Sequence, residues 1–190
     1  MILSVQGNTD VVRALVECGV DPSLPTRRAL RVPAIHYACI NSDHAEVIET
    51  LLELGARVDE RDAAGYTTLA TAAEAGSLEC VKALLAHGAD VSARNNQGLT
   101  VLMDACVCDP HKYKPHTKAA IVRLLLAAGA DPTAEAGGDI PSNTREGFTA
   151  LHYAAQFGNV GALEALLEDG RADMEAATER QGWRPLHQAA

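Results

Sequence analysis

A segment of 33 residues recurs along this chain, and this repeat limits the possible fold more than any other feature. GYTTLATAAEAG begins at Gly65, and GLTVLMDAC begins 33 residues later at Gly98. A third copy begins at Gly147 and a partial copy at Gly182. A fixed period of this length is typical of solenoids, in which each unit packs only against its neighbours. The register predicts one domain, 1–190, with partial units at 1–23 and 182–190 and near-complete units at 32–64, 65–97, 98–146 and 147–181.

Each complete unit is predicted to form two short helices and a turn. The first helix carries an apolar residue and a small pair, as in Leu69 with Ala72 and Ala73, and the small residues allow helices to approach closely. The second helix opens after a glycine at Ser77 or Asn159, whose side-chain oxygen can accept from unpaired backbone N–H groups. The apolar residues that follow have the three-and-four spacing of an amphipathic helix.

This pattern resembles the ankyrin repeat, whose signature is T-P-L-H-x-A followed by G-A-D. The matching segments are TALHYA at 149–154 and RPLHQA at 184–189, with G-A-D at 88–90 and 129–131. The resemblance covers nearly the whole chain. It implies an all-α ankyrin-repeat solenoid of helix-turn-helix units with β-hairpin-like finger loops.

Several positions depart from that signature. Ala70 and Met103 replace the signature His, and Pro33 and Arg184 replace the signature Thr. We therefore expect the Thr-to-His hydrogen bond of the family to be missing or altered in these units. A structural role is expected for the remaining signature histidines and for one that closes a second helix: His36, His152, His187 and His87.

Insertions interrupt the period at 109–118 and 135–144, and we expect both to form loops. Both chain ends cut through a repeat, and no second helix follows to cover Leu186. We therefore expect this chain to be a piece of a longer array.

Charge and composition narrow the partners. The net charge of −9 disfavours nucleic acid, because affinity for phosphate comes mainly from Lys and Arg. No apolar segment is long enough to predict a membrane span, so no membrane partner is expected. The five cysteines are an odd number and widely spaced, which favours a reducing compartment, cytoplasmic or nuclear.

No catalytic or cofactor-binding motif is present, so the sequence predicts a non-catalytic protein without a cofactor. Cys106, Cys108, His111 and His116 could hold zinc, although their spacing is unusual for it and Cys106 replaces a small core residue. A solvated loop is one alternative. Another is a basic loop in which Lys112, Lys114 and Lys118 surround Tyr113 and contact a partner.

The family resemblance implies that partners meet the finger tips and the first-helix face. Nearly all of the few aromatic residues fall on matching positions there, where Tyr, Trp and Phe could anchor a partner. The candidate partner-binding residues are Val32, Tyr37, Tyr66, Leu99, Phe148, Tyr153, Phe157 and Trp183. Arginines would rim this face: Arg27, Arg28, Arg31, Arg61, Arg94, Arg145 and Arg180. The alternative is that these bulky residues simply pack on neighbouring fingers.

The resulting functional expectation is a monomeric protein-interaction module. Its partner would be another protein, in the form of an extended peptide or loop with apolar and acidic residues. The alternative is a regulatory or substrate-recruiting arm of a larger enzyme or channel.

Overall fold

The computed structural model describes residues 8–23, 32–40, 44–107, 115–137, 147–178 and 182–189. Its contacts divide the chain between Asp90 and Val91 into two compact units, so the single domain over 1–190 stays a prediction. The described helices of the first unit are α2 (Thr9–Glu17), α3 (Ala34–Ile40), α4 (Ala45–Glu53), α5 (Thr68–Ala75) and α6 (Leu78–Ala86). Those of the second unit are α7 (Val101–Cys106), α8 (Pro115–Ala127), α9 (Ala150–Gln156), α10 (Val160–Asp169) and α11 (Pro185–Gln188).

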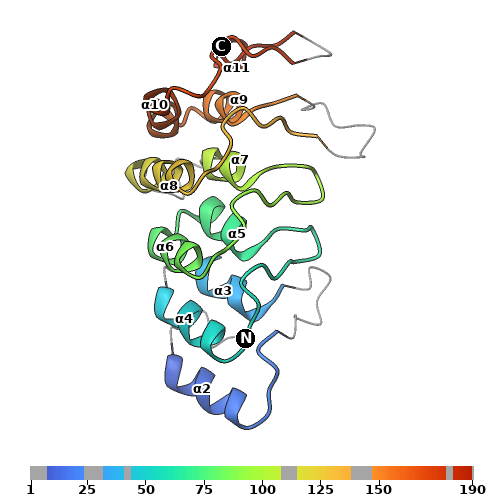
Figure 1. Cartoon of the computed structure of the whole chain (residues 1–190), viewed down its shortest axis with the longest axis vertical. Helices are drawn as coiled ribbons and strands as arrows, with labels where there is room; N and C mark the ends of the chain where they lie inside the picture. Colours follow the sequence, from blue (N-terminus) through green and yellow to red (C-terminus); the bar gives the residue numbers. More distant parts are fainter. Residues whose placement is uncertain are drawn as a thin grey trace. The chain divides into compact units, whose positions relative to one another are not determined.

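Within each unit the helices form two layers (Figure 1). First helices of the repeats, such as α3 and α5, form one layer, and second helices, such as α4 and α6, form the other. Finger loops extend from the side of the first helices. In the described residues the fingers form only isolated antiparallel bridges, Arg61–Thr67 and Arg94–Thr100. The predicted all-α fold of helix-turn-helix units with hairpin-like fingers is confirmed.

Three of the first helices, α5, α7 and α9, begin directly after the threonine of the signature. Thr67 is extended, and its Oγ1 accepts a hydrogen bond from the Ala70 backbone N–H at 3.3 Å. This bond satisfies one of the unpaired donors of the first turn. The same helix ends at Gly76, whose φ of 74° is left-handed and therefore costly for other residues.

The residues before α6 and α10 also tie neighbouring repeats together. Asn159 caps α10 as predicted, because its Oδ1 accepts from the Ala162 N–H at 3.1 Å. Its Nδ2 also donates to the Cys106 carbonyl of the preceding repeat at 3.2 Å. The capping role predicted for Ser77 is wrong. Its side chain makes no cap, and its Oγ instead donates to the Cys39 carbonyl at 2.7 Å.

The loop prediction for 109–118 needs correction at its end, because α8 begins at Pro115. Lys118 lies eleven residues before Gly129, and Ser77 lies eleven residues before Gly88. Lys118 therefore occupies the position of its repeat that Ser77 and Asn159 occupy in theirs, which we call the junction position. Its side chain is fully buried. It therefore cannot belong to the exposed basic loop predicted around Tyr113.

Short polar side chains hold the fingers in shape. Asp62 Oδ1 accepts from the N–H groups of Ala64 and Tyr66, both at 2.9 Å. The Asp62 N–H in turn donates to the Tyr66 carbonyl at 3.0 Å. Asn95 makes the same bonds 33 residues later, to Gln97 and Leu99. These bonds close a tight turn that contains a glycine, which explains why a glycine recurs at this position of the repeat.

The third finger keeps this pairing despite its insertion. The Ala136 N–H donates to the Phe148 carbonyl, and the Gly147 N–H donates to the Ala136 carbonyl at 2.9 Å. The insertion therefore falls between Ala136 and Gly147, slightly later than the predicted 135–144. Residues 138–146 lie outside the described part of the chain.

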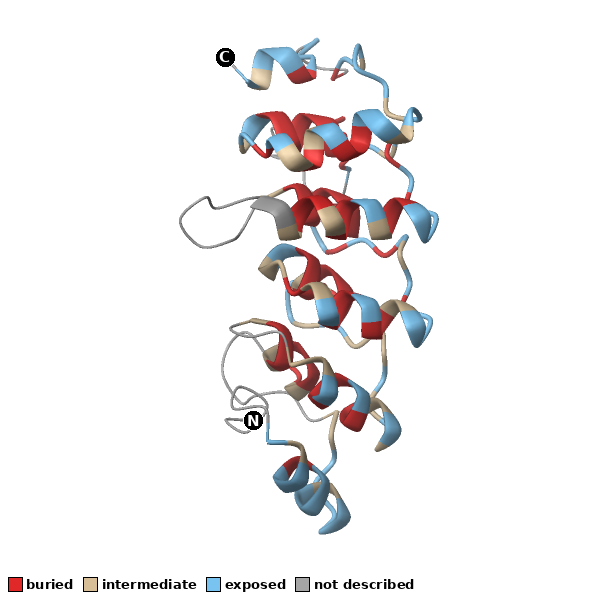
Figure 2. Ribbon diagram, turned by 90° about the vertical axis from the view of Figure 1, so that its left-hand side faces the viewer, coloured by how far each residue is buried: buried red, intermediate tan, exposed pale blue. Residues whose placement is uncertain are grey.

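The core of each unit lies between the helix layers, where small and aliphatic side chains meet. Leu69, Ala72 and Ala73 of α5 and Leu84 of α6 are completely buried. Figure 2 shows this burial along the facing sides of the helices. A fully buried leucine contributes about 1.5–3 kcal/mol, and alanine permits the close approach that lets these short helices pack.

The finger turn gives a stability prediction with a matched control. Replacing Asp62 by Ala leaves the N–H groups of Ala64 and Tyr66 without their acceptor, and we expect a loss of about 1–2 kcal/mol in the free energy of unfolding. Asp62→Asn keeps an acceptor oxygen and reproduces the residue found at Asn95, so it should cost far less. Urea denaturation of both variants measures the difference. Equal losses would contradict the role given to this oxygen.

Candidate protein-interaction surface

The eight candidate anchors divide into two groups by burial. Trp183 is 44% exposed, and Tyr37, Tyr66 and Phe157 are half-buried. The other four are buried: Val32, Leu99, Phe148 and Tyr153. These four cannot serve as exposed anchors, so the structure favours for them the alternative of packing within the fold.

Phe148 and Tyr153 show why the alternative holds in the second unit. Their rings meet edge to face with centroids 5.8 Å apart, and the Phe148 ring stacks on His152 at 5.1 Å. Phe148 is 2% exposed and Tyr153 is 1% exposed. Aromatic contacts of this kind add stabilisation beyond that gained by burying the surface of the rings. The cluster therefore belongs to the core of this repeat.

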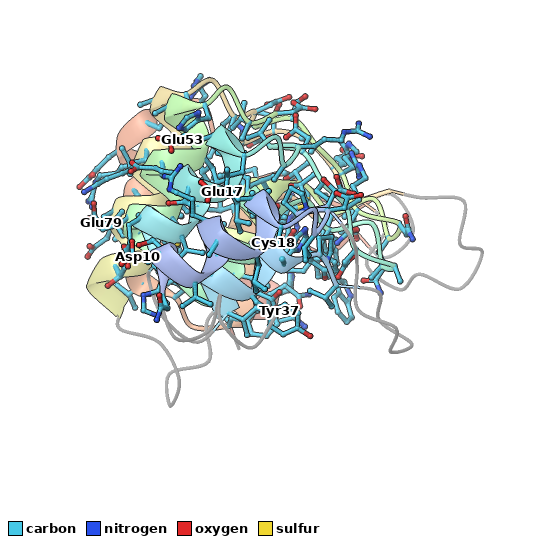
Figure 3. All side chains as sticks on the ribbon, turned by 90° about the horizontal axis from the view of Figure 1, so that it is seen from below. Asp10, Glu17, Cys18, Tyr37, Glu53 and Glu79 are labelled. Carbon is cyan, nitrogen blue, oxygen red and sulfur yellow. The ribbon has the colours of Figure 1, made fainter. Side chains whose placement is uncertain are left out.

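Tyr66 and Tyr37 remain available on the first unit. Tyr66 follows the turn glycine of its finger, and the Asp62 turn fixes its backbone. Tyr37 lies on α3, directly after the buried His36, and Figure 3 shows it at the margin of the unit. Both side chains thus stand on backbone that hydrogen bonds hold in place.

Five of the seven arginines expected to rim this face lie outside the described residues. The two that are described, Arg61 and Arg94, use their guanidinium groups inside the fingers. Arg61 donates to the Gly65 carbonyl at 2.8 Å. Arg94 donates to the carbonyls of Gly98 and Glu135, both at 2.7 Å. Their main role is therefore to brace the fingers.

Two signature histidines join adjacent repeats. His36 contacts the Glu60 carbonyl through Nε2 and the Thr71 hydroxyl through Nδ1, each at 3.0 Å. Because Pro33 stands where the signature has a threonine, His36 bonds to Thr71 of the next repeat in place of a threonine of its own repeat. The Thr-to-His hydrogen bond is therefore altered in this unit, as expected. His152 keeps the family bond to Thr149 and contacts the Trp183 carbonyl at 3.0 Å.

Burial favours the neutral form of both rings. The Thr149 N–H donates to Nδ1 of His152 at 3.2 Å, so Nδ1 carries no proton and Nε2–H donates to Trp183. Burial is the main cause that lowers the pKa of His36 and of His152 below the ordinary 6.5. Backbone carbonyls oppose this shift without reversing it.

A buried polar group in the second unit was missed by the sequence analysis. Asp104, Cys106 and Lys118 are all buried, and both charged groups act electrostatically on the cysteine. Burial dominates and raises the pKa of Cys106 to about 12, so it is a neutral thiol. Only the altered register at the insertion, which places Lys118 at a junction position, could have indicated this arrangement.

The zinc hypothesis gains nothing from this geometry. Cys108, His111 and the side chain of His116 lie outside the described residues, as do Lys112, Tyr113 and Lys114 of the predicted basic loop. In the part of the chain that is described, no group of three or more His, Cys, Asp or Glu is placed to bind a metal. The zinc site and the basic partner-binding loop therefore both stay predictions.

One small cavity, of about 190 Å³, lies in the second unit beside the second finger. Leu102 and Thr100 line it together with Arg94 and Asp131. Hydrogen bonds from Thr133 are the main cause that lowers the pKa of Asp131. The cavity therefore carries a carboxylate beside a guanidinium that already binds two carbonyls, which leaves little net charge to attract an ion.

None of the described helices is both long and apolar enough to span a bilayer. The longest, α8, has 13 residues and contains Arg123.

Comparison with known proteins agrees with the repeat geometry. The family model for ankyrin repeats (3 copies) matches residues 35–136 and 121–190. Similar proteins include the nuclear factor NF-kappa-B p105 subunit of Gallus gallus, 32% identical over 86% of this chain and 15% of that protein. Others are the E3 ubiquitin-protein ligase XB3 of Oryza sativa, 33% identical over 93% of this chain and 38% of that protein, and the mouse ankyrin repeat and SOCS box protein 16, 34% identical over 97% and 45%.

This chain therefore belongs to the ankyrin-repeat family. Ankyrin repeats generally mediate protein–protein interaction. The chain spans less than half the length of these three relatives.

The burial of Phe148 yields a prediction that separates core from surface. Phe148→Ala removes a buried ring, and we expect a loss of about 3–5 kcal/mol in the free energy of unfolding. Tyr66→Ala, at a half-buried finger tip, should cost clearly less. Urea denaturation followed by circular dichroism measures both. A Phe148 variant as stable as the Tyr66 variant would contradict the assignment of Phe148 to the core.

Protonation of the buried histidines should destabilise the fold. The unfolded chain binds protons on them below pH 6.5, whereas the folded chain resists protonation until a lower pH. The stability they contribute is therefore complete above about pH 6.5 and falls as the pH drops below that value. Urea midpoints across this range measure the effect. His152→Gln should reduce the pH dependence, and His87→Gln, at an exposed position, should leave it unchanged; the reverse result would refute this explanation.

Proposed function

We propose that this chain is a non-catalytic module that binds another protein through its finger tips and the accessible side of its first helices. The main support for the proposal is that the half-buried side chains of Tyr66 and Tyr37 extend from backbone that hydrogen bonds hold in place. The hydrogen bonds that Asp62 Oδ1 accepts from the Ala64 and Tyr66 N–H groups hold the finger before any partner arrives. A preformed surface loses less conformational entropy on binding, and aromatic side chains commonly supply the strongest contacts.

The proposed partner is an extended peptide or loop with apolar and acidic residues. Apolar residues would cover the tyrosine rings of the first unit. The acidic preference rests on the exposed Arg57 and on arginines outside the described residues. One copy of the chain supplies Tyr37 and Tyr66 together, so binding at this face requires only a monomer. The net charge of −9 argues against nucleic acid and anionic membranes as partners, and the reduced cysteines favour a cytoplasmic or nuclear setting.

A second candidate function is substrate recruitment within a larger enzyme. It is favoured by two relatives named E3 ubiquitin-protein ligases, KEG of Arabidopsis thaliana and XB3 of rice, of which this chain matches 9% and 38%. In this reading the repeats hold a protein for modification by another domain. An intact gene product that transfers no ubiquitin to a bound protein in the presence of activating and conjugating enzymes would exclude this candidate without affecting the binding proposal.

Peptide selection tests the binding face directly. We expect peptides selected from a random displayed library on the 190-residue chain to be rich in apolar and acidic residues. Tyr37→Ser combined with Tyr66→Ser should weaken their binding at least about tenfold, since two aromatic anchors are lost. Fluorescence anisotropy with a labelled selected peptide measures Kd.

Leu167→Ser is the matched control, because Leu167 is an exposed apolar residue on the second-helix layer. It should bind the peptide like the wild type, and circular dichroism should be unchanged for all variants. Undiminished binding by the double tyrosine variant would overturn the proposed face.

A further inference from the structure

The cavity in the second unit lies between two successive repeats. One wall comes from the start of the second finger and includes Ser92 and Arg94. The opposite wall comes from the segment that follows α8 and includes Ala130 and Asp131. The first unit contains the equivalent pair of segments, one after α4 and one after α6. The same place in the repeat can therefore be compared in the two units.

A carboxylate fills this place in the first unit. Asp59 and Ser92 occupy the same position of their repeats, four residues after the glycine that follows a second helix. Asp90 and Asp131 also share a position, two residues after that glycine. Oδ1 of Asp59 accepts a hydrogen bond from the Asp90 backbone N–H at 3.0 Å. This bond joins the two segments in the first unit.

The same place is open in the second unit, because Ser92 has a shorter side chain than Asp59. No described residue accepts a hydrogen bond from the Asp131 N–H, which matches the bonded N–H of Asp90. Ser92 and Asp131 both line the cavity. The serine therefore accounts for the cavity, and the cavity offers a backbone donor whose equivalent already binds a carboxylate.

The charges around the cavity allow a second carboxylate to enter. Nη1 of Arg94 bonds only to carbonyls, which are neutral, so the guanidinium keeps its positive charge. Oδ1 of Asp131 accepts from the N–H and the hydroxyl of Thr133 at 2.9 and 2.7 Å. Arg171 acts electrostatically on Asp131 but is itself paired with Asp169 at 2.7 Å. Because these charges nearly balance, geometry selects the ligand, and a free anion should bind weakly.

The cavity is large enough for one acidic side chain. Its volume is about 190 Å³, and protein cavities of about 150 Å³ hold benzene, which is larger than the side chain of aspartate. Leu102 and Ala130 supply apolar wall beside the polar groups. Apolar walls with a few fixed polar groups are typical of binding pockets.

We propose that this cavity binds the carboxylate of an aspartate or glutamate side chain of a partner protein. The carboxylate takes the place that Asp59 fills in the first unit and accepts a hydrogen bond from the Asp131 N–H. Hydrogen bonds to an ionised acceptor are stronger than neutral ones, and Arg94 adds a positive charge at the wall. The proposal rests on the protein-binding function proposed above and gives its acidic preference a defined site.

Nuclear magnetic resonance of the 190-residue chain tests the site with N-acetyl-aspartate N-methylamide. We expect the Asp131 N–H signal to move to higher proton frequency and to saturate with a Kd of about 5–100 mM. The Asp90 N–H is an internal control and should not respond, because Asp59 already fills its place. An Asp131 signal that does not move, or one that moves no more than that of Asp90, would overturn the proposal.

A neutral compound of the same shape tests the need for a carboxylate. N-acetyl-asparagine N-methylamide should shift the Asp131 signal with a Kd at least about threefold higher, because its amide oxygen is a weaker acceptor. Equal affinity for the two compounds would contradict the assignment of a carboxylate ligand.

Exchanging the residues at the matching positions provides an independent test. Ser92→Asp fills the cavity with a carboxylate of the chain itself, so the Asp131 signal should no longer respond. Asp59→Ser opens the equivalent place in the first unit, and the Asp90 signal should then respond. Ser92→Ala keeps the cavity open and is the matched control. A response of Asp131 in Ser92→Asp equal to that of the wild type would overturn the proposal, and circular dichroism checks that each variant is folded.

The same measurements separate this site from the tyrosine face. Tyr37→Ser combined with Tyr66→Ser should leave the Asp131 response unchanged, because the compound carries no large apolar group. If that variant loses peptide binding and the wild-type Asp131 signal does not respond, the tyrosine face stands and this site falls. If Asp131 responds and the variant binds peptide like the wild type, this site stands and the tyrosine face falls.

Discussion

Contacts between adjacent repeats are the interaction on which the rest of this structure depends. The described helices, of 4 to 13 residues, are too short to be stable alone, so each gains its stability from burying one face against a neighbour. Polar bridges fix the register of that packing. Ser77 donates to the Cys39 carbonyl, and Asn159 donates to the Cys106 carbonyl. Each bridge satisfies a buried carbonyl of the adjacent repeat, which would otherwise destabilise the stack.

The same dependence explains which aromatic residues are left for binding. Tyr66 and Phe148 each follow the turn glycine of their own finger. Tyr66 is nevertheless half-buried, whereas Phe148 lies in a ring cluster with His152 and Tyr153. The repeat register alone predicts the same role for both residues. Their roles differ because the surrounding side chains, and not the position in the repeat, determine how exposed each ring is.

The sequence by itself determined the helix pairs, the finger turns, the family and the absence of known catalytic motifs, because periodicity and turn glycines are local signals. It also placed the insertions and named Tyr37 and Tyr66 among the possible anchors. Only the tertiary structure decided that Phe148 and Tyr153 are core residues, that Ser77 bridges repeats without capping its helix, and that Lys118 is buried. These outcomes depend on contacts between residues far apart in the chain, and such contacts leave no periodic trace in the sequence.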